Sequence, residues 1–279
     1  MKKLAIYCLF FIFIPSNFIL AQEKNEFTKN PILTSKFQIG VGLFIPTQKV
    51  KFELNGSSEN QEIEFGESFD FNNNSLRPQF YLDWRFAKKW KLSAEYFNAS
   101  YNKNLELEED IVINNGEYTF KKGSNVKLGY KFNLYRVFVG TFISSGLKHE
   151  LGAGLGFHIT NIGPFIEGNI IVNNNDNEFK SASISVTAPL PNLALWYHFA
   201  PTEKWSFSAR LDWFGITINE YSGSLWDVGP CVRYQFSKNF AAALDYRYFK
   251  INANVDQKVW NGSFAMSFSG PTLSLHTTF

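Results

Sequence analysis

The strongest constraint on the fold is an alternation of apolar and polar side chains that continues to the last residue. Leu273, Leu275, Thr277 and Phe279 occupy alternate positions, and Thr272, Ser274, His276 and Thr278 lie between them. Because successive side chains of a strand point to opposite faces, this segment is predicted to be a two-faced strand. The same pattern recurs in most strand-like segments upstream.

Ten segments with this period of two predict an all-β chain. They lie near 36–45, 77–87, 90–96, 119–139, 148–159, 182–199, 205–213, 228–236, 242–248 and 259–279. Short links near 87–89, 200–204 and 237–239 contrast with long polar links near 46–76, 102–118 and 173–181, as in transmembrane barrels. We therefore expect an antiparallel up-and-down transmembrane β-barrel of about ten strands, with eight or twelve as alternatives. Pro230 and the pair Gly163-Pro164 suggest bulges or strand ends.

The N-terminus carries the pattern of an export signal. Lys2 and Lys3 precede an apolar run over 4–20, and Ala21 offers a small residue for cleavage. This arrangement predicts a signal peptide over 1–21, with a retained membrane anchor as the alternative. We expect residues 22–35 to form a periplasmic lead-in and residues 36–279 to form a single barrel domain.

Composition narrows the function classes. Without residues 1–21, the chain has 25 basic and 25 acidic residues, a balance that argues against nucleic-acid binding. Cys231 is then the sole cysteine, so no internal disulfide can form, and a closed barrel would supply stability instead. Aromatic residues make up 18% of the chain. Trp84, Trp90, Trp205 and Trp213 are predicted to contact lipid or its interface.

The export signal, the two-faced strands and the terminal Phe279 resemble the small bacterial outer-membrane β-barrel proteins of the OmpA, OmpX and OmpW types. The resemblance covers the mature chain, and it is architectural, because many functions share this fold. It implies an outer-membrane location among lipid and lipopolysaccharide. It also implies that the barrel-assembly machinery reads the last strand, with Leu273, Leu275 and Phe279 as the assembly signal. Any surface ligand is unknown.

Charged residues on the second face of the strands are expected to point into the lumen. They include Asp83, Arg85, Glu95, Lys127, Lys131, Glu150, Arg210, Asp212, Arg233, Asp245 and Arg247. Because buried charge must be paired, we predict a neutral network that plugs the lumen, centred on Asp83, Arg85, Glu95, Arg210, Asp212, Arg233, Asp245 and Arg247. The alternative is a narrow path for ions or small solutes.

Signals for catalysis are weak. His158 and His198 are expected to face inward on adjacent strands, where a histidine beside a carboxylate could be a general base, but no catalytic or metal-binding motif is present. No catalytic, cofactor or metal site is predicted. The acidic group Glu106, Glu108, Glu109 and Asp110 could bind cations that bridge lipopolysaccharide, although a solvated loop is the simpler interpretation. We predict a non-enzymatic envelope role, structural or in surface interaction. The alternatives are a narrow channel, a lipid-modifying enzyme and a soluble lipocalin-like binder.

Overall fold

The computed structural model describes residues 29–55, 61–66, 76–108, 110–113, 118–172, 176–183, 185–256 and 261–279. The predicted signal peptide over 1–21 and residues 22–28 of the predicted lead-in lie outside the described residues, as does Glu109. In the part of the chain that is described, no helix has the length and apolar character needed to span a membrane.

The described chain is almost entirely strand. One short helix, α1 (Pro31–Thr34), precedes the first strand. The strands are β1 (Phe37–Phe44), β2 (Thr47–Asn55), β3 (Gln61–Gly66), β4 (Arg77–Ala87), β5 (Trp90–Glu106), β6 (Ile111–Ile113), β7 (Tyr118–Phe120), β8 (Asn125–Ser145), β9 (His149–Val172), β10 (Asp176–Ser183), β11 (Val186–Phe199), β12 (Trp205–Ile218), β13 (Tyr221–Gln235), β14 (Phe240–Asp256) and β15 (Asn261–Thr278).

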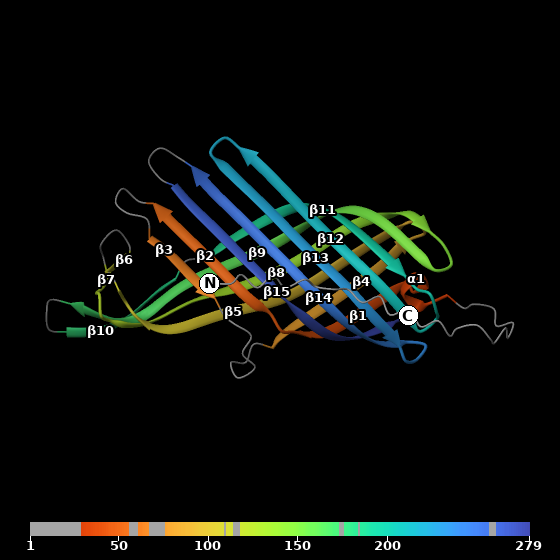
Figure 1. The fold of residues 1–279 in the computed structure, drawn as a ribbon, viewed down its shortest axis with the longest axis horizontal. Helices are drawn as coiled ribbons and strands as arrows, with labels where there is room; N and C mark the ends of the chain where they lie inside the picture. Colours follow the sequence, from red (N-terminus) through yellow and green to blue (C-terminus); the bar gives the residue numbers. More distant parts are fainter. Residues whose placement is uncertain are drawn as a thin grey trace, which may run out of the picture.

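Ten of the described strands close into an antiparallel barrel (Figure 1). Their order around the wall is β1, β4, β5, β8, β9, β11, β12, β13, β14 and β15, and β15 pairs again with β1. At the seam the Phe37 N–H donates to the Phe279 carbonyl at 2.8 Å, and the Phe279 N–H donates back at 3.0 Å. The predicted fold class is confirmed, and each predicted segment supplies one wall strand.

Further strands occur where long connections are predicted. After Ile45-Pro46, β2 pairs with the outer half of β15, and β3 folds back on β2. Likewise β10 folds back on β9, and β6 and β7 form a separate hairpin. The prediction of loops fails here because a polar segment can still pair its backbone groups with a neighbouring strand.

At the two predicted proline positions the strands neither end nor shift register, but one of the two ladders is interrupted at each. β9 pairs with β11 as far as Ile162 and with β10 only from Phe165, and β13 has no pairing with β14 at Gly229 and Pro230. The pairing of β8 with β9 runs through Gly163 and Pro164, and that of β12 with β13 runs through Pro230, without a change of register. The register shifts instead beside Trp84 and beside Phe142. A proline within a strand removes a single donor, and the ladder on its other edge can continue.

Outward-facing side chains form an apolar belt around one part of the barrel. On β12 the belt runs from Trp205 to Trp213, and on β14 it runs from Phe240 to Tyr248, with apolar residues at alternate positions. A strand needs roughly 9–11 tilted residues to cross the hydrocarbon core of a bilayer. The height of the belt therefore matches that of a bilayer core.

Beyond the belt the strands continue as an outer extension, which includes residues 98–106 of β5, 125–133 of β8 and 161–172 of β9. Here the outward face is polar: Asn252 donates to Ser224 at 3.1 Å, and Asn254 donates to Ser222 at 3.3 Å. The inward face is apolar instead, because β8 buries Tyr130, Phe132 and Leu134 in the interior, as well as Val126 and Leu128.

This inversion corrects the expected orientation of Lys127 and Lys131. Both point outward; Lys131 is exposed, and Lys127 pairs with Glu167 at 3.5 Å with 42% of its side chain exposed. The prediction assumes that apolar faces turn to lipid along the whole strand. In the outer extension the outward face is polar and the interior is apolar, the reverse of the belt, so the apolar face of the strand turns inward there.

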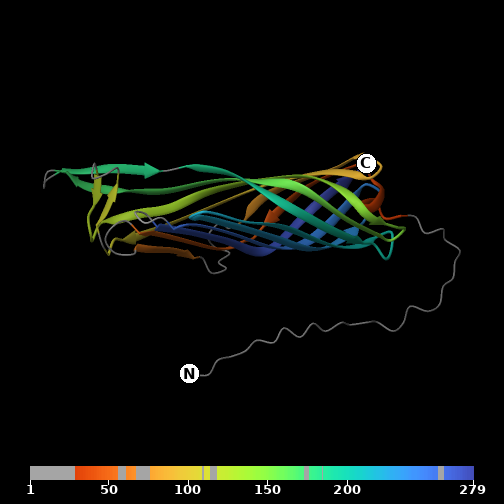
Figure 2. The same cartoon turned by 90° about the horizontal axis from the view of Figure 1, so that it is seen from above.

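The helix α1 lies at the opposite end of the barrel. Figure 2 shows α1 and the C-terminus at one end, with β6, β7 and β10 at the other. Asn30 caps the helix by accepting from the Ile32 N–H at 3.1 Å and donates to the Glu203 carbonyl at 2.8 Å. Arg85 donates to the Ile32 carbonyl at 2.7 Å, so the helix is anchored to an inward-facing side chain of β4.

Glycines on β9 make room for an inward indole. The Trp196 side chain is buried, and its Nε1 donates to Glu150 at 2.8 Å. A Cβ on Gly152 would overlap the Trp196 ring, and one on Gly154 would overlap the Val139 carbonyl. Each glycine therefore permits a close approach that any other residue would prevent.

We expect heat-modifiable electrophoresis from a closed barrel of this kind. Unboiled, detergent-extracted protein should migrate differently from boiled protein on SDS gels, because the hydrogen-bonded wall resists the detergent. Equal mobility of both samples, with the protein soluble without detergent, would favour the soluble binder instead.

Gly152→Ala should destabilise the barrel by about 1–3 kcal/mol through overpacking against Trp196. Urea unfolding in lipid vesicles, followed by tryptophan fluorescence, measures the change. Gly229→Ala is the matched control on an inward face, because its Cβ would lie 3.9 Å from the nearest atom, Arg210 Nη2. Equal unfolding midpoints for both variants would contradict the steric role of Gly152.

Candidate functional site

A network of charged and polar side chains crosses the middle of the lumen. We call it the central network; it consists of Glu95, Arg136, His158, Asn192, Arg210, Asp212, Asp227 and Arg247. These residues come from β5, β8, β9, β11, β12, β13 and β14, so most of the wall contributes. The network contains three carboxylates and three guanidinium groups. It is therefore balanced in charge without counting His158.

Two arginines bridge two carboxylates at its centre. Arg210 contacts Glu95 through Nη1 and donates to both oxygens of Asp227 at 3.1 Å. Arg247 contacts Glu95 through Nη1, and its Nε donates to Asp227 at 3.1 Å. Gln79 donates to Glu95 at 2.5 Å. This set is closed by charge-assisted hydrogen bonds, which are stronger than neutral ones.

A second pair lies beside the first. Arg136 binds Asp212 in a bidentate manner, through Nε and Nη2, both at 2.8 Å. Asn192 donates to the same carboxylate at 3.0 Å, and Arg210 Nε lies 3.3 Å from it. Asp212 is fully buried and bound from three sides, so its charge is compensated within the protein.

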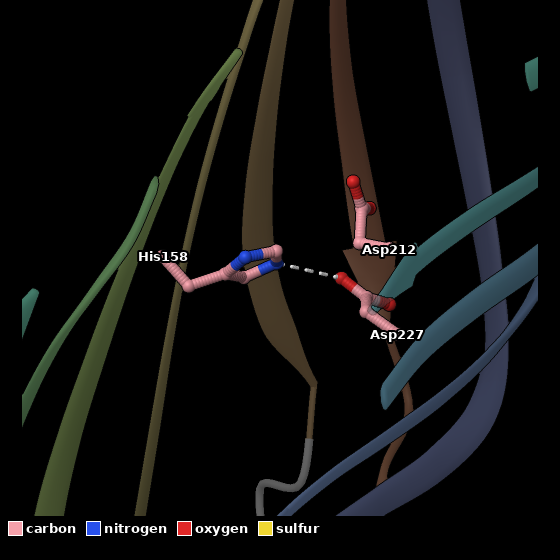
Figure 3. A group of neighbouring side chains, drawn as sticks. All are labelled: His158, Asp212 and Asp227. Carbon is pink, nitrogen blue, oxygen red and sulfur yellow. Dashed lines mark hydrogen bonds and ion pairs between the residues drawn. The ribbon is translucent and has the colours of Figure 1, made fainter. Parts of the chain in front are cut away.

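His158 joins the two parts of the network. Its Nε2 faces Asp227 (Figure 3), at 3.3 Å, and its Nδ1 lies 3.2 Å from Asn192. It is fully buried, so the inward orientation predicted for it is confirmed. His198 also lines the lumen interior, where it is bound to Ser208 at 2.6 Å. It is not next to His158, because the residue of β11 that pairs with His158 is Leu190, eight residues away from His198.

One cluster in the described part of the chain has the ligand types of a metal site: His158, Asp212 and Asp227, with ligand atoms within 4.8 Å of one another. Its carboxylates are already bound by Arg136, Arg210 and Arg247. Three guanidinium charges at this distance repel a cation strongly in a buried site. The arrangement therefore fits an ion-pair network better than a metal centre.

A further ion pair lies toward the α1 end of the lumen. Arg85 contacts Glu150 at 2.5 Å, and Glu150 also accepts from Trp196. The Lys91 ammonium lies 4.5 Å from the centre of the Trp196 ring, a cation–π distance. The predicted lumen residue Arg85 therefore belongs to a separate layer below the central network.

The remaining predicted lumen residues line an interior cavity of about 140 Å³. Asp83 accepts from Ser93, and Asp245 accepts from Ser274 at 3.2 Å. Arg233 is buried, and among the described residues its Nε and Nη2 have no hydrogen-bond partner. Of the predicted set, the structure thus brings together Glu95, Arg210, Asp212 and Arg247, and places Asp83, Arg233 and Asp245 beside them.

An apolar cluster lies in the lumen on the outer side of the central network. It consists of Phe44, Val50, Phe97, Ala99, Tyr130, Phe132, Leu134, Leu225, Phe249, Ile251, Met266 and Phe268. The rings of Phe132 and Phe268 lie 5.0 Å apart. Arg247 stacks over Phe97 at 4.4 Å, so the apolar cluster and the central network are in contact. Together they form two adjoining layers of side chains inside the barrel.

Sequence reasoning misses Arg136, Asn192 and Asp227. Arg136 alternates with the outward Tyr135 and Val137, which signals an inward position, but the apolar inward residues of the same strand obscure it. Asp227 shares the inward face with Gly229 and Arg233 and could be found by extending that alternation. Asn192 follows Pro191, where strand pairing is hard to predict.

The predicted interface tryptophans all point away from the lumen. Trp84, Trp90, Trp205 and Trp213 are between 38% and 47% exposed. Trp213 packs against Trp226 at 6.3 Å, and Trp205 packs against Tyr234 at 4.8 Å, at opposite edges of the belt. Leu273, Leu275 and Phe279 also lie exposed on the outer surface.

One residue of the predicted acidic group, Asp110, has local partners. Asp110 accepts from Lys121 Nζ at 2.8 Å and from the Lys122 N–H at 2.7 Å. The hydrogen bond from Lys121 lowers the pKa of this carboxyl below its ordinary value. Asp110 is thus held in an ion pair at the surface.

No family model and no curated protein match this sequence. The outer membrane protease OmpT from Escherichia coli is similar in structure, with a TM-score of 0.58 and 9% identity over 93% of this chain and all of OmpT. The toluene transporter TodX of P. putida aligns over 89% of this chain and 91% of its own, at 10% identity and a TM-score of 0.36. Ail of Yersinia pestis aligns over 85% and 99%, at 9% identity and a TM-score of 0.26.

The similarity to OmpT concerns the fold alone, and the other two TM-scores are too low to carry an argument. The chain has the fold of the bacterial outer-membrane β-barrels, as its sequence resemblance predicts.

Glu95→Gln should destabilise the barrel by about 3–5 kcal/mol, because it leaves the buried Arg247 and the half-buried Arg210 with one fewer negative charge. Urea unfolding in lipid vesicles measures the loss. Glu167→Gln is the matched control, since it removes the exposed partner of Lys127 and should cost about 0–1 kcal/mol. A loss for Glu95→Gln no larger than that of the control would show that the central network does not hold the barrel together.

Proposed function

We propose that this protein is an integral outer-membrane barrel with a closed lumen and a non-enzymatic envelope role, structural or in surface interaction. The observation that supports the proposal is the packing of side chains across the lumen. The central network spans the barrel with balanced charge, the apolar cluster lies on its outer side, and α1 lies at the other end. A solute would have to break buried ion pairs and move packed aromatic rings to pass.

The placement of His158 argues against the enzymatic alternative. OmpT is named as a protease, but its similarity to this chain concerns the fold alone. The His158 side chain is fully buried, and both ring nitrogens lie against Asn192 and Asp227. A general base must reach the proton of its substrate, and no surface of this histidine is open to one.

The outer extension supports a role at the cell surface. Its wall is polar outside and apolar inside, as in a water-soluble barrel, so it projects beyond the belt as a folded body. Such a body is suited to contact lipopolysaccharide head groups or a ligand outside the cell. The ligand is not identified by any side-chain pattern in the described residues.

The location and assembly route form part of the same proposal. Export would use a signal peptide over 1–21, and insertion would use the assembly machinery acting on Leu273, Leu275 and Phe279. The outward exposure of these three side chains is consistent with recognition before the strand is surrounded by lipid. Outer-membrane lipid would then contact the belt and its tryptophans.

Planar-bilayer recording tests the closed lumen. Folded, heat-modifiable protein should produce no conductance steps, because the lumen is blocked by paired charges and aromatic rings. Arg210→Ala should also be silent, since the apolar cluster remains in place. Steps in the unsubstituted protein that change in size with Arg210→Ala would establish the narrow channel instead.

A further inference from the structure

The barrel wall opens on one side, where β11 and β12 separate. Their pairing runs from Phe199 opposite Phe207 to Leu193 opposite Trp213 and ends there. Beyond this point β11 continues to pair with β9, and β12 continues to pair with β13. The ladder therefore stops between two strands that are both still well formed.

Two prolines explain why the ladder stops. The Ala200 N–H donates to the Lys148 carbonyl at 2.7 Å, so even-numbered residues of β11 direct their N–H groups toward β9. Odd-numbered residues then direct theirs toward β12. Pro189 and Pro191 are odd-numbered and lack an N–H, so they remove two consecutive donors from the β12 edge and leave the β9 edge intact.

A pocket of about 540 Å³ lies at this separation. It is lined by Val137, Phe138, Val139, Leu155, Gly156, Phe157, Pro191, Asn192, Leu193, Trp213, Phe214 and Gly215. Most of these residues belong to the outward apolar face. The volume lies within the roughly 300–1,000 Å³ of small-molecule sites. Continuing the register past Leu193 would place Pro191 opposite Gly215, so the missing pairing forms part of the lining.

The one amide side chain in the lining is already engaged. Asn192 lies at the inner end of the pocket, donates to Asp212 at 3.0 Å and contacts His158 at 3.2 Å. Its side chain thus lies between the pocket and the rest of the central network. An occupant would meet hydrocarbon and aromatic surfaces, which favours an apolar chain over a polar solute.

We propose that this pocket holds an acyl chain of a membrane lipid. The occupant is assigned by continuity, because the lining residues Val139, Leu155 and Leu193 belong to the same outward belt that would face the bilayer. Lipid would enter sideways, between strands that prolines keep apart. The inference rests on the proposed membrane location and is independent of whether the lumen conducts.

Native mass spectrometry tests the proposal. Protein folded in vesicles of palmitoyl-oleoyl phosphatidylglycerol and released into detergent should retain one phospholipid of the expected mass. Leu193→Trp, which fills the pocket, should lower the retained fraction by about tenfold, because it displaces methylene groups from apolar contact. Leu195→Trp is the matched control: Leu195 lies two residues along the same outward face, outside the pocket, and should leave retention unchanged.

Restoring the donors gives an independent test. Pro189→Val combined with Pro191→Val should extend the β11–β12 ladder, give the two new valine N–H groups slow amide exchange and reduce lipid retention. Absence of a phospholipid adduct on folded protein, a detergent adduct alone, or equal retention by Leu193→Trp and Leu195→Trp would each overturn the inference. Heat-modifiability of the same samples reports separately on the barrel, so failure of the proposed function would be recognised on its own.

Discussion

Buried charge inside a closed wall is the constraint on which the rest of the structure depends. An unpaired carboxylate or guanidinium in this interior would cost several kcal/mol, so the charges of the central network take partners from other strands. Glu95 on β5 reaches Arg247 on β14, 152 residues away, and Arg136 on β8 reaches Asp212 on β12. These contacts form only when the barrel is closed and its strands are in register, which couples the network to the fold.

The side chains around the central network also stabilise its buried charges. Arg247 stacks on Phe97, and His158 lies 6.1 Å from the Phe249 ring, so the apolar cluster covers the charged layer and limits access of water. On the other side, Gly152 leaves space for Trp196, which holds Glu150 opposite Arg85. A lower local dielectric strengthens each ion pair and also raises the penalty for breaking it.

The wall changes its polarity along its own strands. At the belt it is apolar outside and charged within, and in the outer extension it is polar outside and apolar within. A single strand such as β8 shows both arrangements, with Val137 outward at the belt and Phe132 inward beyond it. The opening between β11 and β12 begins at Trp213, the outer edge of the belt. Unpaired backbone is costly beside hydrocarbon, and the prolines lessen that cost by removing the donors themselves.

The sequence by itself determines the strands, their alternation and most of the lumen charges. Period-two patterns locate all ten wall strands, and the charged face opposite Trp205 and Trp213 correctly places Arg210 and Asp212 inside. These features are local, because the face of a side chain follows from its position in the strand.

Tertiary structure alone decides which charges meet and where the apolar belt ends. Pairing Glu95 with Arg247 depends on closure, which brings distant strands together. Phe132 points inward and Lys131 points outward because the outer extension is apolar inside and polar outside. The alternation of the sequence would be the same if the two faces were exchanged. The separation of β11 from β12 likewise depends on which neighbouring strand faces the missing N–H groups of Pro189 and Pro191. Only the strand register determines that this strand is β12.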